Sequence, residues 1–555
     1  MKLVIVGGVA GGASAAARAR RLDEKAEIVL LERGPDVSFA NCGLPYYLAG
    51  EITERSKLLV TPLERLRKRY RLDARPLSEV ASLDLAAKEV VVRDLARGTE
   101  YRERFDKLIL SPGAAPRLPG VPGQELPGVH TLRNLQDADH IMARLKAGAR
   151  RALVMGGGFI GLEMAECLKH RGLAVTLVER NPQVLMALDP EIARPVADEL
   201  ASQGVEILTG RKVTAIRQRD DGPILVEMED GDRRDADIVI MGIGVAPEND
   251  LARGAGLALG ASGGIRVDAH MRTSHPDVYA VGDAVETPSV VTGNHAVVAL
   301  GGPANRQGRV AASHAMGRAD NLLDNRYRGS QGTAIVRVFG KTAGITGASE
   351  RMLRRLNTPH LTATVHPAHH AGYYPGAEGM TLKVLFDPAT GRLLGSQAVG
   401  GAGVDKRLDV LAMAIQGGMT VYDLEEAELC YAPPYGSAKD PVNMAGFVAA
   451  GLLRGDHPQI TAADLKRRLD AGDPPPLLDV RTPAEHARGT VPGAVNIEVD
   501  ALRERIAEAR SLAGGGPLVV YCQVGMRGYL ATRILLQHGI EARNLSGGYT
   551  SWTRA

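Results

Sequence analysis

The chain has 555 residues and a mass of 58.9 kDa, which at about 100–200 residues per domain predicts several domains. Its 67 Lys and Arg residues against 64 Asp and Glu residues give a net charge of +3, so the overall charge gives no reason to expect nucleic acid or a membrane as a partner. Only four cysteines are present, which excludes a disulfide scaffold; with no signal peptide and no long apolar run, the sequence predicts a cytoplasmic protein.

The N-terminal segment predicts a dinucleotide-binding βαβ unit. Residues 2–6 are a short apolar run, typical of a buried parallel strand, and residues 7–12 form a glycine-rich turn before a helix-forming segment. A second apolar run, residues 27–31, ends in Glu32, about 20 residues after the glycines, where an acidic residue binds an adenosine ribose. One position departs from the fingerprint, because Val9 replaces its middle glycine. The residues expected at this nucleotide site are Gly7, Gly8, Gly11, Gly12, Glu32 and Arg33.

A second unit of the same kind follows and matches the fingerprint fully. Residues 151–155 read as a strand, residues 156–161 as the glycine turn, and residues 162–170 as a helix. The next strand ends in Glu179, which favours the free 2′-hydroxyl of NADH, although the neighbouring Arg180 keeps NADPH open. The residues expected here are Gly156, Gly158, Gly161 and Glu179.

Two dinucleotide folds in one chain predict that one redox cofactor passes electrons to another. Residues 273–284, TSHPDVYAVGDA, resemble the second flavin motif of the FAD/NAD-linked disulfide reductases. This resemblance implies that Asp283 holds the flavin ribityl chain, with Gly282 and Ala304 also at the FAD site. It also implies the domain order FAD half, inserted NAD domain, FAD half and dimerisation domain.

The cysteine at position 42 lies directly after the first βαβ unit, in SFANCGLPYY. Most flavin disulfide reductases carry two cysteines here. A lone cysteine cannot close an internal disulfide, so its oxidised state must be a mixed disulfide, a sulfenate or a persulfide. A glycine- and helix-rich site near a flavin is expected to lower the pKa of the Cys42 thiol.

The same stretch resembles the single-cysteine branch of that family, the coenzyme A disulfide reductases, whose nearest relatives are NADH oxidases and peroxidases. Ser14, Arg18 and Arg21 lie at i, i+4 and i+7 on one face of the first helix; a solvated basic face is the plainer interpretation of the two arginines. The resemblance implies that coenzyme A is bound by Ser14, Arg18, Arg21, Ser38, Asn41, Asn305, His369 and Lys439. The bound form can be a mixed disulfide with Cys42.

Residues 372–375 (GYYP) and 430–435 (CYAPPY) resemble two C-terminal segments of the family's proteins. In those proteins the segments reach into the active site of the partner subunit. Tyr373 and Tyr431 match the family's catalytic tyrosines, and a phenol can protonate a leaving thiolate. The resemblance therefore implies a homodimer. Cys167 is expected to be packed inside a helix, and the role of Cys430 stays open.

The last hundred residues carry a second chemistry. The strand at residues 518–521 leads into Cys522, and the six-residue loop from Cys522 to Arg527 precedes a helix at residues 529–538. Such a loop gathers backbone N–H groups around the sulfur and favours a thiolate or a persulfide anion. The segment resembles a rhodanese domain, with DVRTPAEHARGTVPGAVNI as its entry signature and GGYTSW as its exit.

These interpretations combine into an α/β fold class with two Rossmann-like dinucleotide-binding domains, an α+β dimerisation domain and a C-terminal α/β rhodanese domain. The predicted domains are FAD-binding 1–113 and 260–325, NAD(P)-binding 114–259, dimerisation 326–450, a linker 451–460 and rhodanese 461–555. The expected cofactors are FAD, NADH or NADPH, and coenzyme A, with no metal.

The predicted function is reduction of coenzyme A persulfide, polysulfide and coenzyme A disulfide through Cys42, while Cys522 and Arg527 deliver sulfane sulfur. Ranking persulfide first depends on the pairing of the two domains and not on single residues. One alternative is an NADH oxidase or peroxidase that cycles Cys42 through a sulfenate. Another is a redox sensor whose rhodanese domain docks a partner.

Overall fold

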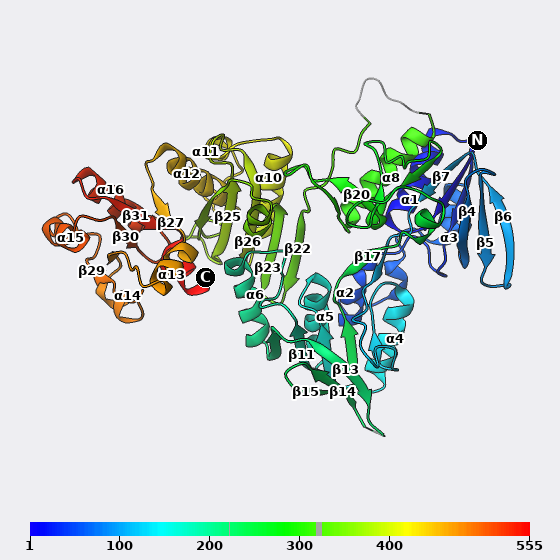
Figure 1. Ribbon diagram of the computed structural model, residues 1–555, viewed down its shortest axis with the longest axis horizontal. Coiled ribbons are helices and arrows are strands. Elements are labelled where there is room, and N and C mark those ends of the chain that lie inside the picture. Colours follow the sequence, from blue (N-terminus) through cyan, green and yellow to red (C-terminus); the bar gives the residue numbers. More distant parts are fainter. Residues whose placement is uncertain (221, 318–324) are drawn as a thin grey trace. The chain divides into compact units, whose positions relative to one another are not determined.

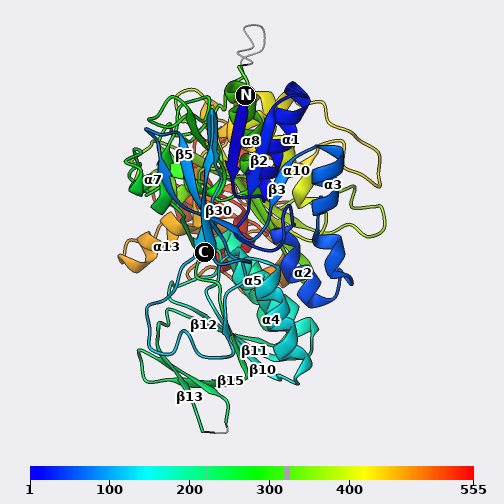
Figure 2. The same cartoon turned by 90° about the vertical axis from the view of Figure 1, so that its right-hand side faces the viewer.

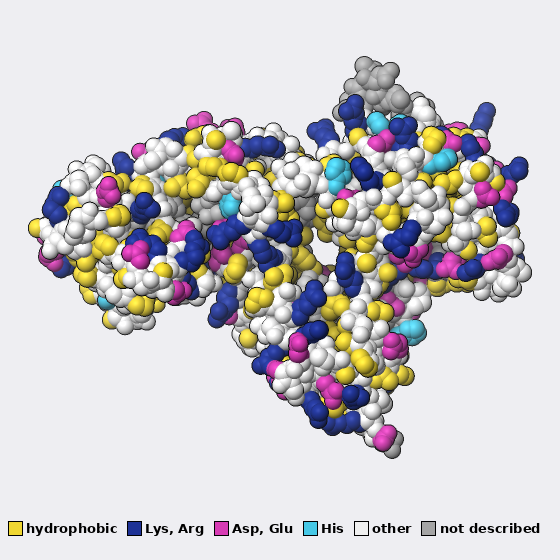
Figure 3. All heavy atoms as spheres, viewed as in Figure 1, with side chains coloured by type: hydrophobic (Ala, Val, Ile, Leu, Met, Phe, Trp, Pro, Cys, Tyr) yellow, Lys and Arg dark blue, Asp and Glu magenta, His cyan; other side chains and the backbone are white. Residues whose placement is uncertain are grey.

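The computed structural model describes residues 1–220, 222–317 and 325–555. The chain divides into two compact units, Met1–Val184 with Gln203–Gly332, and Leu185–Ser202 with Thr333–Ala555. Within the described ranges, no helix combines the length and apolar character needed to cross a bilayer. Basic and acidic side chains are interspersed on the face shown in Figure 3, as the balanced charge of the sequence predicts.

The first unit contains a five-stranded parallel sheet in the order β19-β7-β1-β2-β3. Its members are β1 (Lys2–Val6), β2 (Glu27–Leu31), β3 (Asp73–Arg75), β7 (Lys107–Leu110) and β19 (Val278–Ala280). Helices α1 (Ala10–Leu22) and α8 (Gly301–Ala315) pack against each other (Figure 2). They approach closely because Gly308 has no side chain; a Cβ there would lie 2.3 Å from the carbonyl oxygen of Gly11.

Smaller elements of the first unit surround this sheet. Residues around Cys42 form the 3₁₀ helix η1 (Asn41–Gly43), followed by α2 (Leu44–Ala49), η2 (Arg55–Leu58) and α3 (Leu63–Arg69). Further elements are β4 (Ser78–Asp84), β5 (Glu89–Asp94), β6 (Thr99–Arg104), α7 (Asp250–Gly254), β18 (Ile265–Arg266), η3 (Gly282–Ala284), β20 (Val285–Pro288) and β21 (His295–Val297).

A second parallel sheet in the first unit has the order β12-β11-β10-β16-β9. Its strands are β9 (Val129–His130), β10 (Arg151–Met155), β11 (Ala174–Glu179), β12 (Val205–Thr209) and β16 (Ile238–Met241), with helices α4 (Leu135–Lys146) and α5 (Phe159–His170). An antiparallel sheet of β13 (Val213–Gln218), β14 (Ile224–Met228) and β15 (Arg233–Ala236) adjoins it, and β8 (Ala114–Pro116) pairs with β17 (Val245–Pro247). Both predicted βαβ units are therefore present, and the prediction of two Rossmann-like folds is confirmed.

The second unit begins with an antiparallel sheet in the order β22-β23-β26-β25-β24 (Figure 1). Its strands are β22 (Ala334–Val338), β23 (Lys341–Gly347), β24 (Leu361–Val365), β25 (Met380–Phe386) and β26 (Leu393–Gly400). Helix α10 (Val404–Gln416) and helix α6 (Pro190–Ser202) both pack on β23 and β26, and α9 (Glu350–Arg355), α11 (Val421–Glu426) and α12 (Pro441–Arg454) complete this part.

A buried ionic cluster attaches α6 to this sheet. The ammonium of Lys383, 2% exposed, lies 2.9 Å from Asp189, 2.6 Å from Glu191 and 2.6 Å from Glu350. Asp189 and Glu191 flank the start of α6, and Gln397 on β26 also donates to Asp189. The single ammonium of Lys383 thus binds all three carboxylates and joins β25 to the start of α6 and to α9.

The rhodanese-like part is a parallel sheet in the order β27-β31-β30-β28-β29. Its strands are β27 (Gln459–Ile460), β28 (Leu477–Asp479), β29 (Val495–Asn496), β30 (Leu518–Tyr521) and β31 (Ala542–Leu545). Its helices are α13 (Ala462–Asp470), α14 (Pro483–Ala487), α15 (Ile506–Ala513), α16 (Met526–Gln537) and α17 (Gly548–Arg554).

Two details differ from the sequence-based expectation. Helix α12 continues to Arg454 and β27 occupies residues 459–460, so the predicted linker 451–460 is mostly ordered structure. Helix α16 begins at Met526 and not at residue 529, which places Arg527 in the first helical turn.

Candidate functional site

The two predicted nucleotide turns are built in the same way. Gly7 and Gly156 have φ values of +94° and +103°, in the region that favours glycine. A Cβ at Gly12 would lie 1.8 Å from the carbonyl oxygen of Gly7, and one at Gly161 would lie 1.9 Å from that of Gly156. Each glycine pair thus lets a helix N-terminus approach the end of its strand, where a pyrophosphate binds.

The departure at Val9 has a simple geometric explanation. Gly158 occupies the equivalent position in the second turn, and a Cβ placed on Gly158 would meet no atom within 4 Å. Val9 lies just before α1 as its N-cap residue. The fold itself therefore does not require a glycine at this middle position.

The two predicted ribose ligands occupy matching positions. Glu32 accepts hydrogen bonds from the backbone N–H groups of Gly8, at 2.7 Å, and Gly34, at 2.8 Å. Glu179 accepts in the same way from Gly157, at 2.7 Å, and Asn181, at 2.8 Å. Each carboxylate is held beside its glycine turn, as a ribose ligand must be.

The remaining predicted FAD residues lie around the first turn. A Cβ on Gly11 would approach the carbonyl oxygen of Ala304 to 3.5 Å, and one on Gly282 would lie 3.8 Å from the Ala304 side chain. Burial raises the pKa of the Asp283 carboxyl in η3. Arg33 is exposed and pairs with Glu248 at 3.2 Å. The glycine cradle and the enclosed Asp283 fit FAD, and the second turn with Glu179 fits an NAD-type nucleotide.

Cys42 lies in η1, and the expectation that its pKa would be lowered is wrong in this structure. Burial of the sulfur is the largest cause of a raised pKa, although the residue as a whole is exposed. The carboxylates of Glu163 and Asp283 raise the Cys42 pKa further because they disfavour a thiolate beside them, while a backbone hydrogen bond lowers it slightly. Cys42 and Asp283 are therefore electrostatic neighbours, as a thiol beside the flavin site would be.

Glu163→Gln is expected to make Cys42 more reactive. Glu163 on α5 raises the pKa of the Cys42 thiol, so removing its charge increases the thiolate fraction at any pH below that pKa. Alkylation of Cys42 by iodoacetamide, followed by peptide mass spectrometry, should be several-fold faster near neutral pH, with its pH profile displaced downward. Tyr46→Phe is the control, because it removes the 3.1 Å hydrogen bond to Glu163 but keeps the carboxylate; an unchanged profile in Glu163→Gln would contradict the electrostatic account.

The predicted coenzyme A residues of the first unit fall into two groups. On the α1 and α8 helices, Ser14 donates to the side chain of Asn305, and Arg18 donates to Ser313 at 3.0 Å; Arg21 is exposed one turn beyond Arg18. In the Cys42 loop, Asn41 accepts a hydrogen bond from the Cys42 N–H at 3.1 Å. Ser38 is buried with φ +52°. The structure brings Ser14, Arg18 and Asn305 together and places Asn41 against Cys42.

The two predicted tyrosines of the second unit meet each other. The hydroxyls of Tyr373 and Tyr431 are 3.0 Å apart, and the side chains are 77% and 51% exposed. The hydrogen bond to Tyr431 raises the pKa of Tyr373, which keeps that phenol protonated. The pair thus presents two hydroxyl groups to solvent, where another chain can use them.

A buried ion pair joins the two segments that carry the tyrosines. Arg407 binds Asp440 at 2.7 Å and donates to the carbonyl oxygen of His369, also at 2.7 Å. Lys439 is exposed immediately before Asp440. Arg407 therefore links residues near 370 with residues near 440, and it was missed in the sequence because a single arginine on a helix gives no local signal.

Cys522 lies at the end of β30 and is buried. Of the N–H groups expected to surround it, that of Gly525 donates to Cys522 Sγ at 3.2 Å. Arg527 forms a two-point ion pair with Glu485, at 2.7 Å for both contacts. This pairing contributes to a raised Arg527 pKa, and it holds the guanidinium in place beside the loop.

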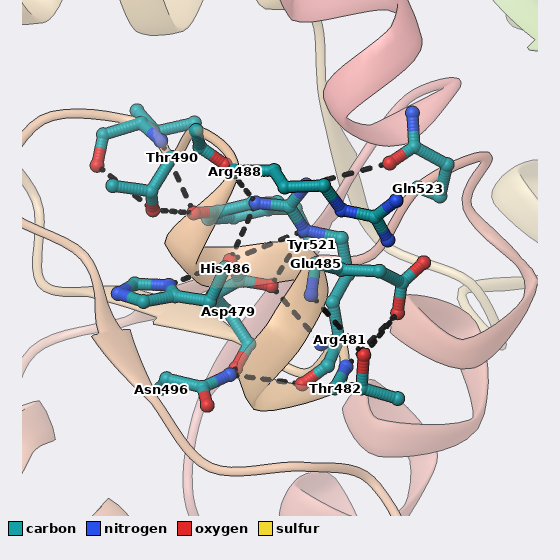
Figure 4. Close-up of polar contacts among 12 residues, drawn as sticks. Asp479, Arg481, Thr482, Glu485, His486, Arg488, Thr490, Asn496, Tyr521 and Gln523 are labelled. Atoms are coloured by element: carbon teal, nitrogen blue, oxygen red, sulfur yellow. Dashed lines mark hydrogen bonds and ion pairs between the residues drawn. The ribbon is translucent and has the colours of Figure 1, made fainter.

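Behind this loop lies a polar network that the sequence reasoning did not assign (Figure 4). Asp479 is fully buried and binds Arg481 at 2.7 Å and His486 at 2.9 Å. Arg481 also donates to the loop residue Gln523 at 3.3 Å. The sequence motif DVRTPAEHA contains the charged residues of this region, Asp479, Arg481, Glu485 and His486. Only the structure shows that these side chains lie beside the Cys522 loop.

The other two cysteines differ in their surroundings. Cys167 is packed within α5, and burial raises its pKa to about 12, as expected of an inert thiol. Cys430 is exposed next to Tyr431.

Comparison with known proteins agrees with this architecture. Residues 1–307 match the family model described as pyridine nucleotide-disulphide oxidoreductase, residues 333–440 its dimerisation domain, and residues 461–555 a rhodanese-like domain. The coenzyme A disulfide reductase of Staphylococcus haemolyticus is 34% identical over 452 residues, covering 81% of this chain and 100% of that protein.

Two solved structures resemble the whole chain. Reduced Bacillus anthracis CoADR-RHD is 44% identical with a TM-score of 0.96, covering 100% of this chain and 98% of that one. An NAD-dependent persulfide reductase from A. fulgidus is 36% identical with a TM-score of 0.91, covering 100% of both chains. The protein belongs to the pyridine nucleotide-disulphide oxidoreductase family and carries that family's dimerisation domain and a C-terminal rhodanese-like domain.

Proposed function

We propose that the protein is an NAD(P)H- and FAD-dependent reductase of coenzyme A persulfide, polysulfide and coenzyme A disulfide, with Cys42 as its redox centre. The observation that carries this proposal is the lone Cys42 beside Asp283 and the glycine cradle of the first nucleotide turn. The similarity to a coenzyme A disulfide reductase and to a persulfide reductase supports the same substrate class.

FAD held at the first glycine turn and NAD(P)H held at the second would supply two electrons to the Cys42 sulfur, and the residues of the chain determine which sulfur receives them. The Cys42 thiolate attacks the inner sulfur of a coenzyme A persulfide, which forms a mixed disulfide between Cys42 and coenzyme A and releases hydrosulfide. Two electrons then cleave the mixed disulfide, which frees coenzyme A thiolate and restores the Cys42 thiolate. With coenzyme A disulfide, the first leaving group is coenzyme A thiolate.

Tyr373 and Tyr431 are proposed to protonate the leaving sulfur across the interface of a homodimer. Both tyrosines are exposed on the second unit, and a phenol carries its proton at neutral pH. The dimerisation domain supports the homodimer. In the same proposal, His369 and Lys439 of one subunit contact coenzyme A bound beside Cys42 of the other.

Coenzyme A is proposed to lie along α1, with its phosphates at Arg18 and Arg21 and its pantetheine end near Ser38, Asn41 and Asn305. Replacing both arginines by Ala should raise the KM for coenzyme A substrates by tenfold or more, because charge-assisted hydrogen bonds contribute about 1.5–3 kcal/mol each. The KM for inorganic polysulfide should change little. Arg20 on the same helix, which is bound to the carbonyl oxygens of Tyr70 and Arg71, is a site for a structural control variant; equal losses with both substrate types would argue against the assignment.

The rhodanese-like domain is proposed to deliver sulfane sulfur. The Cys522 thiolate takes the outer sulfur of a donor persulfide, forming the Cys522 persulfide and releasing the donor thiolate. Coenzyme A thiolate then takes that sulfur and regenerates the Cys522 thiolate, which balances the transfer without a change in electron count. Arg527, held by Glu485, and the Gly525 N–H lie beside the sulfur that carries this charge.

Cys522→Ser is therefore expected to separate the two activities. Coenzyme A disulfide reduction should remain nearly intact, because its electrons pass through Cys42 alone. Turnover with polysulfide should fall, and thiosulfate:cyanide sulfurtransferase activity should disappear. Cys167→Ala, at a thiol packed inside α5, serves as the matched thiol control. Unchanged kinetics of Cys522→Ser with every sulfur substrate would mean that the domain docks a partner instead.

A further inference from the structure

The loop that holds Cys522 depends on the conformation of one glycine. Gly525 has φ +104°, in the region that favours glycine, and its N–H donates to Cys522 Sγ at 3.2 Å. Its carbonyl oxygen accepts the first helical hydrogen bond of α16, from the N–H of Tyr529 at 2.8 Å. Whatever fixes the Gly525 carbonyl therefore also helps to keep the neighbouring N–H pointed at the sulfur.

The side chain of Asn544 is in contact with that carbonyl. Asn544 belongs to β31, is 2% exposed, and donates from Nδ2 to the Gly525 oxygen at 3.0 Å. The amide reaches this position because Gly528, in the first turn of α16, has no side chain. A Cβ there would lie 2.2 Å from Asn544 Oδ1.

A histidine outside the matched rhodanese-like segment contacts the same amide nitrogen of Asn544. His457 Nε2 is 2.8 Å from Asn544 Nδ2, and the imidazole packs against Tyr529 of α16 with ring centroids 4.2 Å apart. Burial, and then the charge of Arg533, lowers the pKa of His457 to about 4. The ring is therefore neutral near pH 7, and its Nε2 is able to accept a hydrogen bond from the Asn544 amide.

His457 also connects this arrangement to helix α12, which packs on β24 and β25 of the antiparallel sheet. Its backbone N–H donates to the carbonyl oxygen of Gly451 in α12 at 3.0 Å. On the adjoining turn of α16, Arg533 donates to the carbonyl oxygen of Asp456 at 2.9 Å. The residue that orients Asn544 is thus anchored at the junction between the two domains of the second unit.

From these contacts we infer that Asn544 and His457 are positioning residues for sulfur transfer: by fixing the Gly525 carbonyl they restrain the backbone on both sides of the Gly525 Cα, so that the Gly525 N–H stays directed at the charged sulfur of Cys522. The inference rests on the proposed function of Cys522 as a sulfur carrier. In this arrangement the segment that joins the domain to α12 helps to support the Cys522 loop.

The test uses the full-length protein with Asn544→Leu. The rate of iodoacetamide alkylation of Cys522 is followed by peptide mass spectrometry across a pH series, together with sulfurtransferase turnover. Losing a hydrogen bond of this kind should slow alkylation near neutral pH by about three- to tenfold and displace the profile to higher pH. Turnover should fall by a similar factor.

Asn496→Leu is the matched control, because Asn496 donates to two other backbone oxygens of the same domain, those of Asp479 and Arg481, both at 2.9 Å. It should affect stability without displacing the Cys522 profile. A second pair of variants keeps the test valid if Asn544→Leu does not fold. His457→Leu should displace the pH profile of Cys522 alkylation to higher pH. His457→Gln keeps a hydrogen-bond acceptor for Asn544 and should restore the profile at least in part.

The positioning role is overturned if folded Asn544→Leu or His457→Leu leaves the alkylation profile unchanged, or if Asn496→Leu displaces it equally. If the profile moves as expected while the wild-type protein transfers no sulfur, the positioning role stands and the proposed function of the domain fails.

Discussion

Cys42→Ser should lose NAD(P)H-dependent reduction of coenzyme A disulfide and polysulfide, by a factor of at least about 100 in kcat. A serine hydroxyl does not ionise near neutral pH and cannot form a mixed disulfide, and the thiol chemistry at this site has no second cysteine to take over. The measurement is anaerobic NAD(P)H oxidation with each acceptor. Retained flavin absorbance would show that the nucleotide site is intact.

Cys522→Ser is the matched comparison for this variant, because it also removes one thiol but should leave coenzyme A disulfide reduction nearly unchanged. If Cys42→Ser kept more than a few per cent of wild-type turnover, Cys42 could not be the redox thiol.

Arg407→Leu is expected to cause the largest loss of stability. It removes the closest cation of the buried Asp440 carboxylate and leaves only Lys406, at 4.0 Å, beside it; breaking such a pair from one side costs about 3–5 kcal/mol. It also removes the hydrogen bond to the carbonyl oxygen of His369, which joins the two segments bearing Tyr373 and Tyr431. Thermal unfolding should begin at a lower temperature, and amide exchange should rise first near residues 370 and 440.

The double variant Arg407→Leu, Asp440→Asn is the control, since it removes both charges while an asparagine still caps α12. It should recover much of the lost stability. A single variant as stable as the wild type, or a double variant less stable than the single one, would show that the pair does not hold these segments.

The nucleotide-binding folds could be predicted from the sequence because their signals are local. Each strand, glycine turn, helix and acidic residue follows in chain order, and the side chains of Glu32 and Glu179 bind backbone groups close to their own glycine turns. The loop that holds Cys522 could also be predicted from the sequence, because its strand, loop and helix follow one another directly in the chain. Family resemblance supplied the predicted order of the domains, and the comparisons show the succession of a pyridine nucleotide-disulphide oxidoreductase region, its dimerisation domain and a rhodanese-like domain.

What the sequence could not provide depends on residues far apart in the chain. Burial of the Cys42 sulfur, and then the approach of the Glu163 and Asp283 carboxylates, arise only in the fold, which is why a lowered pKa was expected for Cys42 and a raised one is found. The cluster around Lys383 joins residues separated by nearly two hundred positions. Asn544 and His457 are ordinary polar residues of a strand and a connecting segment until the fold places them behind the Cys522 loop.

The central claim is tested most directly by an anaerobic assay that counts sulfide released per NAD(P)H oxidised with coenzyme A persulfide as the acceptor. Reduction of the persulfide to coenzyme A and hydrogen sulfide takes two electrons, so the proposed function predicts one sulfide for each NAD(P)H, released by the wild type and by Cys522→Ser but not by Cys42→Ser. NAD(P)H oxidation that requires oxygen or peroxide and yields no sulfide from the persulfide would contradict the proposal and identify an oxidase or peroxidase instead.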